Sequence, residues 1–196
     1  MEPASLSATD LACRRGERLL FRGLSFALEA GEALQVAGPN GTGKSSLLRI
    51  LAGLLRPFAG AVDRKGEIAL LDERLALDGD LPLGRALGFW LDLDRVGFLA
   101  RESTADAIGL GGLLDVPVRY LSTGQRKRAA IVQSNARAAP IWLLDEPLNG
   151  LDAEAAAAFQ RQVADYLAAG GIAVIASHQP FAAPGLARIE LAEFAP

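Results

Sequence analysis

The fold of this chain is decided by one stretch, Gly38-Pro39-Asn40-Gly41-Thr42-Gly43-Lys44-Ser45. It fits the pattern G-x-x-x-x-G-K-[ST], which is typical of a loop that wraps around phosphate groups. A short apolar run, 33–37, precedes it, and the apolar spacing of 47–51 behind it favours a helix. The pattern requires a strand before the loop and a helix after it. This context favours a phosphate site over a chance glycine-rich turn.

The residue types of this loop explain how it would hold a nucleotide. Its glycines let successive backbone N–H groups point inward at phosphate oxygens, and the following helix adds the positive end of its dipole. Lys44 is expected to reach the β- and γ-phosphates, and the Ser45 hydroxyl is placed to ligate Mg²⁺. Residues 38–46, ending in Ser46, are therefore the predicted nucleotide-binding segment.

Length and composition limit the class of protein. The 196 residues are 51% hydrophobic and 22% charged, which predicts one globular domain. No apolar run approaches the ~18 residues of a membrane-spanning helix, and the first residues lack the features of a secretion signal. The single cysteine, Cys13, excludes an internal disulfide and a multi-cysteine metal cluster. These features favour the cytoplasm, and a net charge of −3 argues against a nucleic-acid binder.

Strand and helix patterns alternate along most of the chain. Apolar strands are expected at 33–37, 68–71, 141–144 and 172–176, after a β-rich opening with strands at 6–13 and 19–28. Helices are expected from Lys44 to about Leu55 and from Ala153 to Ala169, with a helical insert over 81–138. Strands that are apolar throughout imply a parallel sheet covered on both faces, an α/β fold with its ligand at the carboxyl ends of the strands.

Two adjacent carboxylates, Asp145 and Glu146, follow the predicted strand 141–144. Side by side they repel each other unless a cation or a proton-transfer role stabilises them. Asp145 is suited to Mg²⁺ and Glu146 to polarising an attacking water as general base. An ordinary acidic loop is the alternative, which the upstream phosphate loop disfavours.

The stretch Leu121-Ser122-Thr123-Gly124-Gln125 predicts the start of a helix. Ser122 and Gln125 have the spacing of a capping box. Three basic residues, 126–128, then crowd the positive end of that helix, which is unfavourable unless an anion lies opposite. A second phosphate-facing surface and a solvated basic turn are both compatible with this pattern.

These motifs together resemble the ATP-binding cassette family. The phosphate loop, 121–125, 141–147, 148–152 and His178 occur in the order and at about the spacing of that family, over nearly the whole chain. The resemblance implies a P-loop NTPase fold of the ABC-ATPase type, with a parallel-sheet core, an antiparallel β subdomain and a helical insert. It also implies ATP and Mg²⁺ as ligands and ATP hydrolysis as the activity.

The resemblance further implies a homodimer in which each cassette completes the other's site. Ser122 and Gly124, with Gln125 beside them, would then contact the partner's ATP at its γ-phosphate. His178 looks like the histidine that senses the γ-phosphate, although a strand-end histidine is the ordinary interpretation. Asp152 looks like the aspartate that links the two sites, and capping of the following helix explains it equally well.

Two positions depart from the family pattern. Arg15 stands where most cassettes carry an aromatic residue that stacks on adenine, and a guanidinium also lies flat on a base. Glu73 stands nearest the glutamine that usually follows the strand 68–71. A carboxylate there is expected to approach Mg²⁺.

Smaller features, such as 13–21, 54–57 and 170–180, resemble the branch that exports haem for cytochrome c maturation. This implies membrane-spanning partner subunits and a peripheral position on the cytoplasmic face of the inner membrane. The aromatics Phe89, Trp90 and Phe98 are candidates for docking those subunits, although such residues are more often core. The alternatives are the ATPase subunit of another transporter and a soluble cassette protein that acts on nucleic acid. A phosphate-loop kinase or GTPase is disfavoured by residues 121–125.

Overall fold

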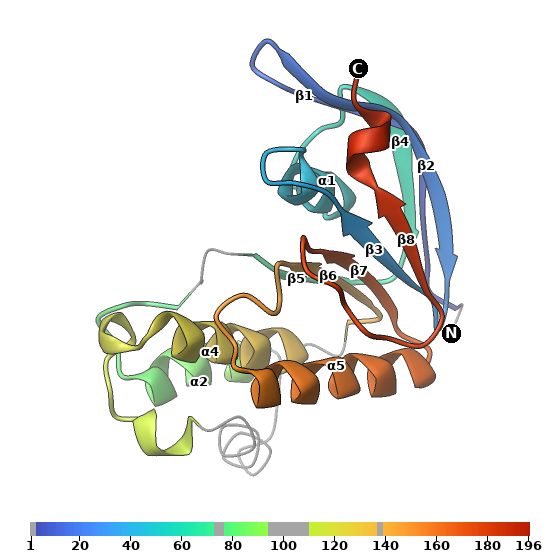
Figure 1. Ribbon diagram of the computed structural model, residues 1–196. Coiled ribbons are helices and arrows are strands. Elements are labelled where there is room, and N and C mark those ends of the chain that lie inside the picture. Colours follow the sequence, from blue (N-terminus) through green and yellow to red (C-terminus); the bar gives the residue numbers. More distant parts are fainter. Residues whose placement is uncertain (1–2, 73–76, 94–109, 137–138) are drawn as a thin grey trace. The chain divides into compact units, whose positions relative to one another are not determined.

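The computed structural model describes residues 3–72, 77–93, 110–136 and 139–196 (Figure 1). The chain divides into two compact units. The first unit comprises Met1–Asp72, Ala139–Pro147 and Ala158–Pro196, and the second comprises Glu73–Ala138 and Leu148–Ala157. The second unit contains the helical insert expected over 81–138. A single domain for the whole chain stays a prediction.

A five-stranded parallel sheet forms the centre of the first unit, in the order β5-β6-β7-β3-β8. The strands are β3 (Ala33–Ala37), β5 (Ile68–Leu71), β6 (Ile141–Asp145), β7 (Ile172–Ala176) and β8 (Leu186–Glu190). The first four confirm the predicted strands and the predicted α/β fold. The edge strand β8 was not predicted, because Arg188 and Glu190 interrupt its apolar pattern.

A smaller antiparallel sheet completes the strands of this unit, in the order β2-β1-β4. Its long hairpin, β1 (Ser5–Arg15) and β2 (Arg18–Glu29), confirms the two strands expected in the opening. Strand β4 (Ala59–Lys65) is not among the strands predicted above, because its residues are small, charged and mostly exposed. This sheet is the expected antiparallel part of the fold.

Two helices lie on opposite faces of the parallel sheet (Figure 1). Helix α1 (Lys44–Leu51) packs Leu47 and Leu51 into a core that includes Leu143 of β6. Helix α5 (Ala153–Ala168) stacks Tyr166 on Trp142, with ring centroids 3.9 Å apart. Because neighbouring residues of a strand point to opposite faces, the sheet is covered on both sides, as its apolar strands predict. Helix α1 ends four residues before the predicted boundary at Leu55.

The second unit is built from helices around its own apolar core. These are α2 (Leu83–Leu93), α4 (Thr123–Ala136) and the short 3-10 helices η1 (Gly111–Leu113) and η2 (Val118–Tyr120). Leu83, Leu110 and Leu121 are buried together in this core. A further 3-10 helix, η3 (Leu191–Phe194), belongs to the first unit. Helix α2 lies near the start of the helical insert expected over 81–138, and residues 94–109 lie outside the described residues.

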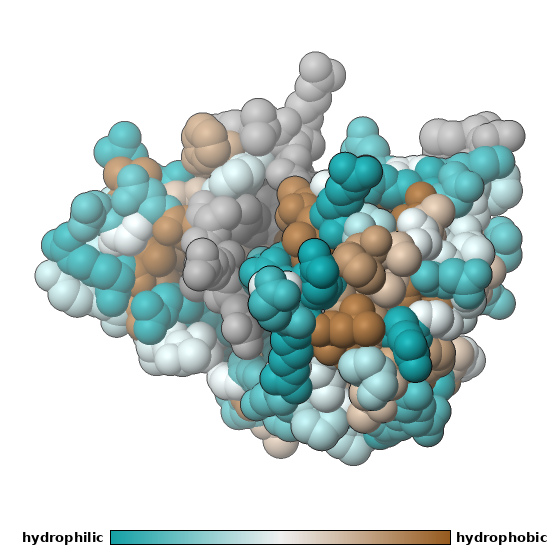
Figure 2. Space-filling view, turned by 90° about the horizontal axis from the view of Figure 1, so that it is seen from above, coloured by the Kyte–Doolittle hydropathy of each residue, from teal (hydrophilic) through white to brown (hydrophobic). Residues whose placement is uncertain are grey.

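The large apolar side chains on the described surface are few. Figure 2 shows hydrophobic groups separated by hydrophilic ones on the face seen from above. Leu54, Phe58, Phe89 and Tyr120 are exposed, and the guanidinium of Arg14 lies 4.6 Å from the ring centre of Phe58. Among the described residues, no helix has the length and apolar character needed to cross a membrane.

Candidate nucleotide site

The predicted phosphate loop joins the end of β3 to the start of α1, as its pattern requires. Its glycines Gly38, Gly41 and Gly43 have φ angles of 141°, 82° and 110°, which side-chain-bearing residues rarely adopt. Gly43 caps α1, and a Cβ there would lie 3.2 Å from atoms of Leu20 and Phe21. The loop is therefore folded against β2 in a shape that only glycine permits.

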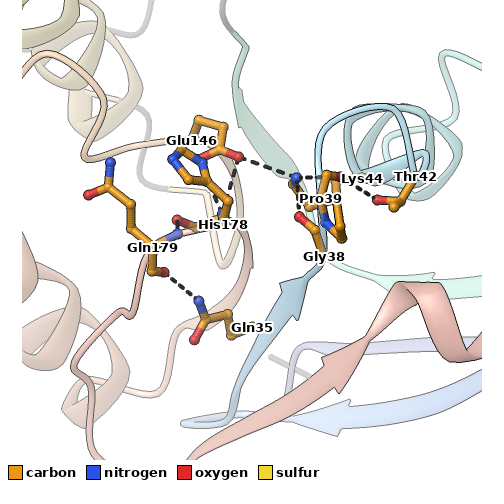
Figure 3. A network of polar contacts seen from close by, with 9 residues as sticks. Gln35, Gly38, Pro39, Thr42, Lys44, Glu146, His178 and Gln179 are labelled. Atoms are coloured by element: carbon orange, nitrogen blue, oxygen red, sulfur yellow. Dashed lines mark hydrogen bonds and ion pairs between the residues drawn. The ribbon is translucent and has the colours of Figure 1, made fainter.

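Lys44 points its ammonium group back into the loop (Figure 3). Its Nζ donates to the carbonyl of Gly38 at 2.7 Å and to that of Pro39 at 3.2 Å, and the residue is buried. Thr42 Oγ1 donates to the same Pro39 carbonyl at 2.9 Å. The positive charge thus lies inside the ring of backbone that is expected to hold the phosphates.

Glu146 connects Lys44 to His178 (Figure 3). Its Oε1 lies 3.5 Å from Lys44 Nζ, and its Oε2 lies 2.9 Å from His178 Nδ1. The backbone N–H of His178 also donates to Oε1 at 3.2 Å. Three predicted site residues from separate parts of the chain therefore meet at one buried carboxylate.

The backbone of Glu146 has an uncommon conformation, with a φ of 45°. Its N–H donates to the carbonyl of Ala176 at 2.8 Å, one residue beyond the pairing of Asp145 with Ala176. The turn directs the carboxylate toward Lys44 while β6 continues its pairing with β7. Non-glycine residues at positive φ are often found at functional sites.

The predicted Mg²⁺ ligands Ser45 and Asp145 both belong to the first unit. Asp145 ends β6 as a buried carboxylate, and Ser45 is a half-buried residue in the first turn of α1, next to Ser46. Hydroxyl and carboxylate oxygens are donors that Mg²⁺ accepts, so the residue types fit this ion. The third predicted ligand, Glu73, lies outside the described residues.

Arg15 lies exposed at the end of β1, where it pairs with Arg18 across the hairpin. The hairpin packs against the phosphate loop through Leu20 and Gly43. The hairpin end, 14–18, carries no aromatic side chain.

The predicted helix start at Ser122 is confirmed in the second unit. The Ser122 N–H donates to Gln125 Oε1 at 2.8 Å, and the Gln125 N–H donates to Ser122 Oγ at 3.2 Å. Gly124 is required by packing, since a Cβ there would lie 2.4 Å from the carbonyl oxygen of Gly150. Both side chains of the capping box are therefore bonded to the helix that they start.

Asp152 caps α5 in the way that its ordinary interpretation predicts. Its Oδ1 accepts the N–H of Ala155 at 2.8 Å. The approach of Gly150 to Gly124 brings the stretch 148–152 against the start of α4 inside the second unit. Residues 122–125 and Asp152 thus occupy neighbouring helix starts, both with N–H groups that favour anions.

One polar side chain near the first unit's site was missed by sequence reasoning. Gln35 lies buried in the middle of β3, and its amide donates to the backbone carbonyl of Gln179 at 2.7 Å (Figure 3). The sign that could have identified it is an amide inside the otherwise apolar run Ala33–Ala37. Buried amides require a hydrogen-bond partner, so this position had to contact something polar.

Comparison with known proteins agrees with this geometry. A family model described as ABC transporter matches residues 21–149. A protein of Novosphingobium aromaticivorans, named cytochrome c biogenesis ATP-binding export protein CcmA, is 58% identical over the full length of both chains. The protein of the same name from Sphingopyxis alaskensis is 54% identical, over 92% of this chain and 93% of its own.

A solved structure shares the fold. A candidate ABC transporter ATP-binding protein from Pyrococcus furiosus superposes with a TM-score of 0.83, covering 98% of this chain and 100% of its own, at 21% identity. At this identity the likeness concerns the fold alone. The fold, the family model and the full-length relatives agree with one another. The chain therefore belongs to the ABC transporter family, as a full-length relative of the CcmA proteins.

Proposed function

We propose that this chain is the ATP-hydrolysing subunit of a membrane exporter that serves cytochrome c biogenesis, with haem as the exported molecule. The observation that carries the proposal is the full-length similarity to proteins named as ATP-binding export proteins of cytochrome c biogenesis. The contacts of Lys44, Glu146 and His178 support the hydrolytic part of it.

The loop 38–46 is proposed to bind the phosphates of ATP through its backbone N–H groups. Lys44 would exchange its contacts with the Gly38 and Pro39 carbonyls for β- and γ-phosphate oxygens. Ser45 and Asp145 would hold Mg²⁺, with Glu73 as a further proposed ligand. When bound, that ion supplies positive charge that offsets the charge on the phosphates.

Glu146 is proposed to accept a proton from the attacking water. Its carboxylate is buried, and the Lys44 ammonium lies 3.5 Å from it. His178 Nδ1, at 2.9 Å, would orient the carboxylate, and the rest of its exposed ring would reach the γ-phosphate. A carboxylate fixed at both oxygens holds a water in one orientation, which is what general-base catalysis needs.

A second copy of the chain is proposed to complete the site. Ser122 and Gly124 lie at an exposed or half-exposed helix start, where N–H groups and the helix dipole favour a phosphate. The basic residues 126–128 in the same turn add positive charge. Asp152, at the neighbouring helix start, would link the two sites of the dimer.

Membrane-spanning subunits are proposed as the other partners, with this chain bound peripherally at the cytoplasmic face of the inner membrane. Phe89 on α2 is 63% exposed and meets Trp90 edge to face. Trp90 also packs against the core of the second unit, so Phe89 is the better candidate for docking. Phe98 lies outside the described residues.

The proposal is tested in a strain from which the gene has been deleted and into which genes for the parent protein or its variants are then introduced. Removal should abolish covalent haem attachment to c-type cytochromes, measured by haem staining of membrane proteins. Lys44→Ala should reproduce the loss at normal protein levels, whereas Lys65→Ala, on β4, should restore attachment. Normal c-type cytochromes in the deletion strain would refute the cytochrome c role and favour another transporter.

A further inference from the structure

The buried amide of Gln35 belongs to no part of the phosphate loop, yet it reaches the segment that carries His178. Gln35 pairs with Ile175 of β7 and with Arg188 of β8, so its strand has neighbours on both sides. It is 3% exposed in a strand whose other residues are apolar. An amide in such a place is destabilising unless it has a hydrogen-bond partner.

That partner is a backbone carbonyl one residue beyond His178. Gln35 Nε2 donates to the oxygen of Gln179 at 2.7 Å (Figure 3). Pro180 follows, and a proline restricts the residue before it to extended conformations. The Gln179 carbonyl is therefore limited in direction by its own chain and bound by a side chain from β3.

The peptide groups before this carbonyl are also bound one after another. The Ala176 carbonyl accepts from the Glu146 N–H at 2.8 Å, and the Ser177 N–H donates to the Val36 carbonyl at 3.1 Å. The Gln179 N–H donates to Ser177 Oγ at 3.0 Å. The hydrogen bond from Gln35 is the last of this series, because the Gln179 carbonyl follows His178 in the chain.

We propose that Gln35 is a positioning residue for hydrolysis, which acts by holding the backbone around His178 so that its imidazole stays on Glu146. The inference rests on the proposed roles of Glu146 and His178. His178 makes two contacts to the Glu146 carboxylate, one from its backbone N–H at 3.2 Å and one from Nδ1 at 2.9 Å. A shift of the backbone there moves both contacts together.

The test replaces Gln35 by methionine, which keeps the length and suits a buried strand but donates no hydrogen bond. The rate of ATP hydrolysis at saturation, kcat, should fall about tenfold, as loss of one aligning hydrogen bond predicts. The Kd for ATP, measured by titration, should stay within about twofold, because Lys44 and its loop are unchanged. If Gln35 only stabilised the fold, its replacement would not lower kcat while leaving the Kd for ATP unchanged.

The control is Tyr166→Phe. Tyr166 also donates from a half-buried side chain to a backbone carbonyl, that of Ala139 at 2.9 Å, but this carbonyl lies two residues before β6, at the amino ends of the sheet's strands. This variant should lower the Tm with no change in kcat. If Tyr166→Phe lowers kcat as Gln35→Met does, the effect is general loosening of the fold and the inference is wrong.

A double-mutant cycle with His178→Ala separates the inference from the proposed function. If Gln35 acts through His178, Gln35→Met should have no further effect on kcat in the His178→Ala protein. Should the two effects multiply, Gln35 acts elsewhere and the inference is overturned, although His178 keeps its role. If His178→Ala alone leaves kcat unchanged, the proposed role of His178 is refuted, and the inference with it.

Discussion

The described residues place two kinds of site in the two units of the chain. In the first unit, side chains far apart in the sequence face one another, as with Glu146 and His178, which are 32 residues apart. In the second unit, Ser122, Gln125 and Asp152 bond to residues three positions away, at the starts of their own helices. The first arrangement gathers Lys44 and His178 around one carboxylate, the proposed base, whereas the second arrangement forms helix starts where the proposed second copy would place its phosphate.

This difference explains why the two units should respond differently to substitution. Loss of a side chain at the first unit's site removes a group that is proposed to take part in hydrolysis. In the second unit, backbone N–H groups form the proposed binding surface. A substitution there is expected to act through the bulk of the new side chain, which changes the shape of that surface, and not through the loss of a reactive group.

The largest effect is expected for Glu146→Gln. Hydrolysis should fall about a hundredfold or more, because the amide does not accept the proton from water. ATP binding should persist, because the phosphate loop is unchanged. Lys44 also no longer has to leave a carboxylate in order to contact the phosphates. Phosphate release and ATP titration measure the two quantities.

The matched control for this change is Glu154→Gln, an exposed carboxylate in the first turn of α5. It should hydrolyse ATP at the parent rate. A Glu146→Gln protein that turns over ATP nearly as fast as the parent would show that Glu146 is not the base.

A smaller effect is expected for Gly124→Ala in the second unit. The new Cβ would lie 2.4 Å from the Gly150 carbonyl oxygen, so the two helix starts must move apart. Overpacking of this kind destabilises by about 1–3 kcal/mol. Urea unfolding should show the loss, and hydrolysis should fall with it because the surface offered to a second copy changes.

Gly88→Ala is the matched control in α2, where nothing lies within 4 Å of an added Cβ. It should stabilise the protein by up to about 1 kcal/mol, since alanine is the better helix former. Equal losses of stability in Gly88→Ala and Gly124→Ala would argue against the close approach of Gly124 and Gly150.

The smallest effect is expected for Arg15→Tyr. A tyrosine ring at the end of β1 should tighten ATP binding by about threefold, because a guanidinium already offers a flat surface to the base. The parent should accordingly prefer ATP over GTP only modestly. Arg18→Tyr, across the hairpin, is the control. A strong preference for ATP that survives Arg15→Ala would mean that another residue recognises adenine.

Much of the fold was predictable from the sequence because its decisive residues act locally. The spacing of Ser122 and Gln125 predicted a helix start, and the two hydrogen bonds confirm it. The apolar runs around β3, β6 and β7 predicted a parallel sheet for the same reason. Strands β4 and β8 were not predicted, because exposed strands carry no continuous apolar pattern.

The site was predictable only as a set of residue types near one edge of the sheet. Lys44, Glu146 and His178 were each expected there, but the contacts among them depend on the backbone turn at Glu146. Gln35 was missed because its partner is a backbone carbonyl. Every residue has such a group, so the sequence does not indicate which one a side chain will contact. Contacts of that kind are settled by tertiary structure alone.

The central claim is that the first unit's site is completed by Ser122 and Gly124 of a second copy. The most direct measurement is the mass of Glu146→Gln in solution, with and without ATP, by sedimentation. The protein should have the mass of one chain, 20.6 kDa, without nucleotide and twice that mass with ATP. Adding Ser122→Arg to Glu146→Gln should keep the ATP-bound protein at the mass of one chain, whereas adding Ala157→Arg, on the exposed part of α5, should not. A Glu146→Gln protein that binds ATP and stays at the mass of one chain, or a dimer that Ser122→Arg leaves intact, would contradict the account.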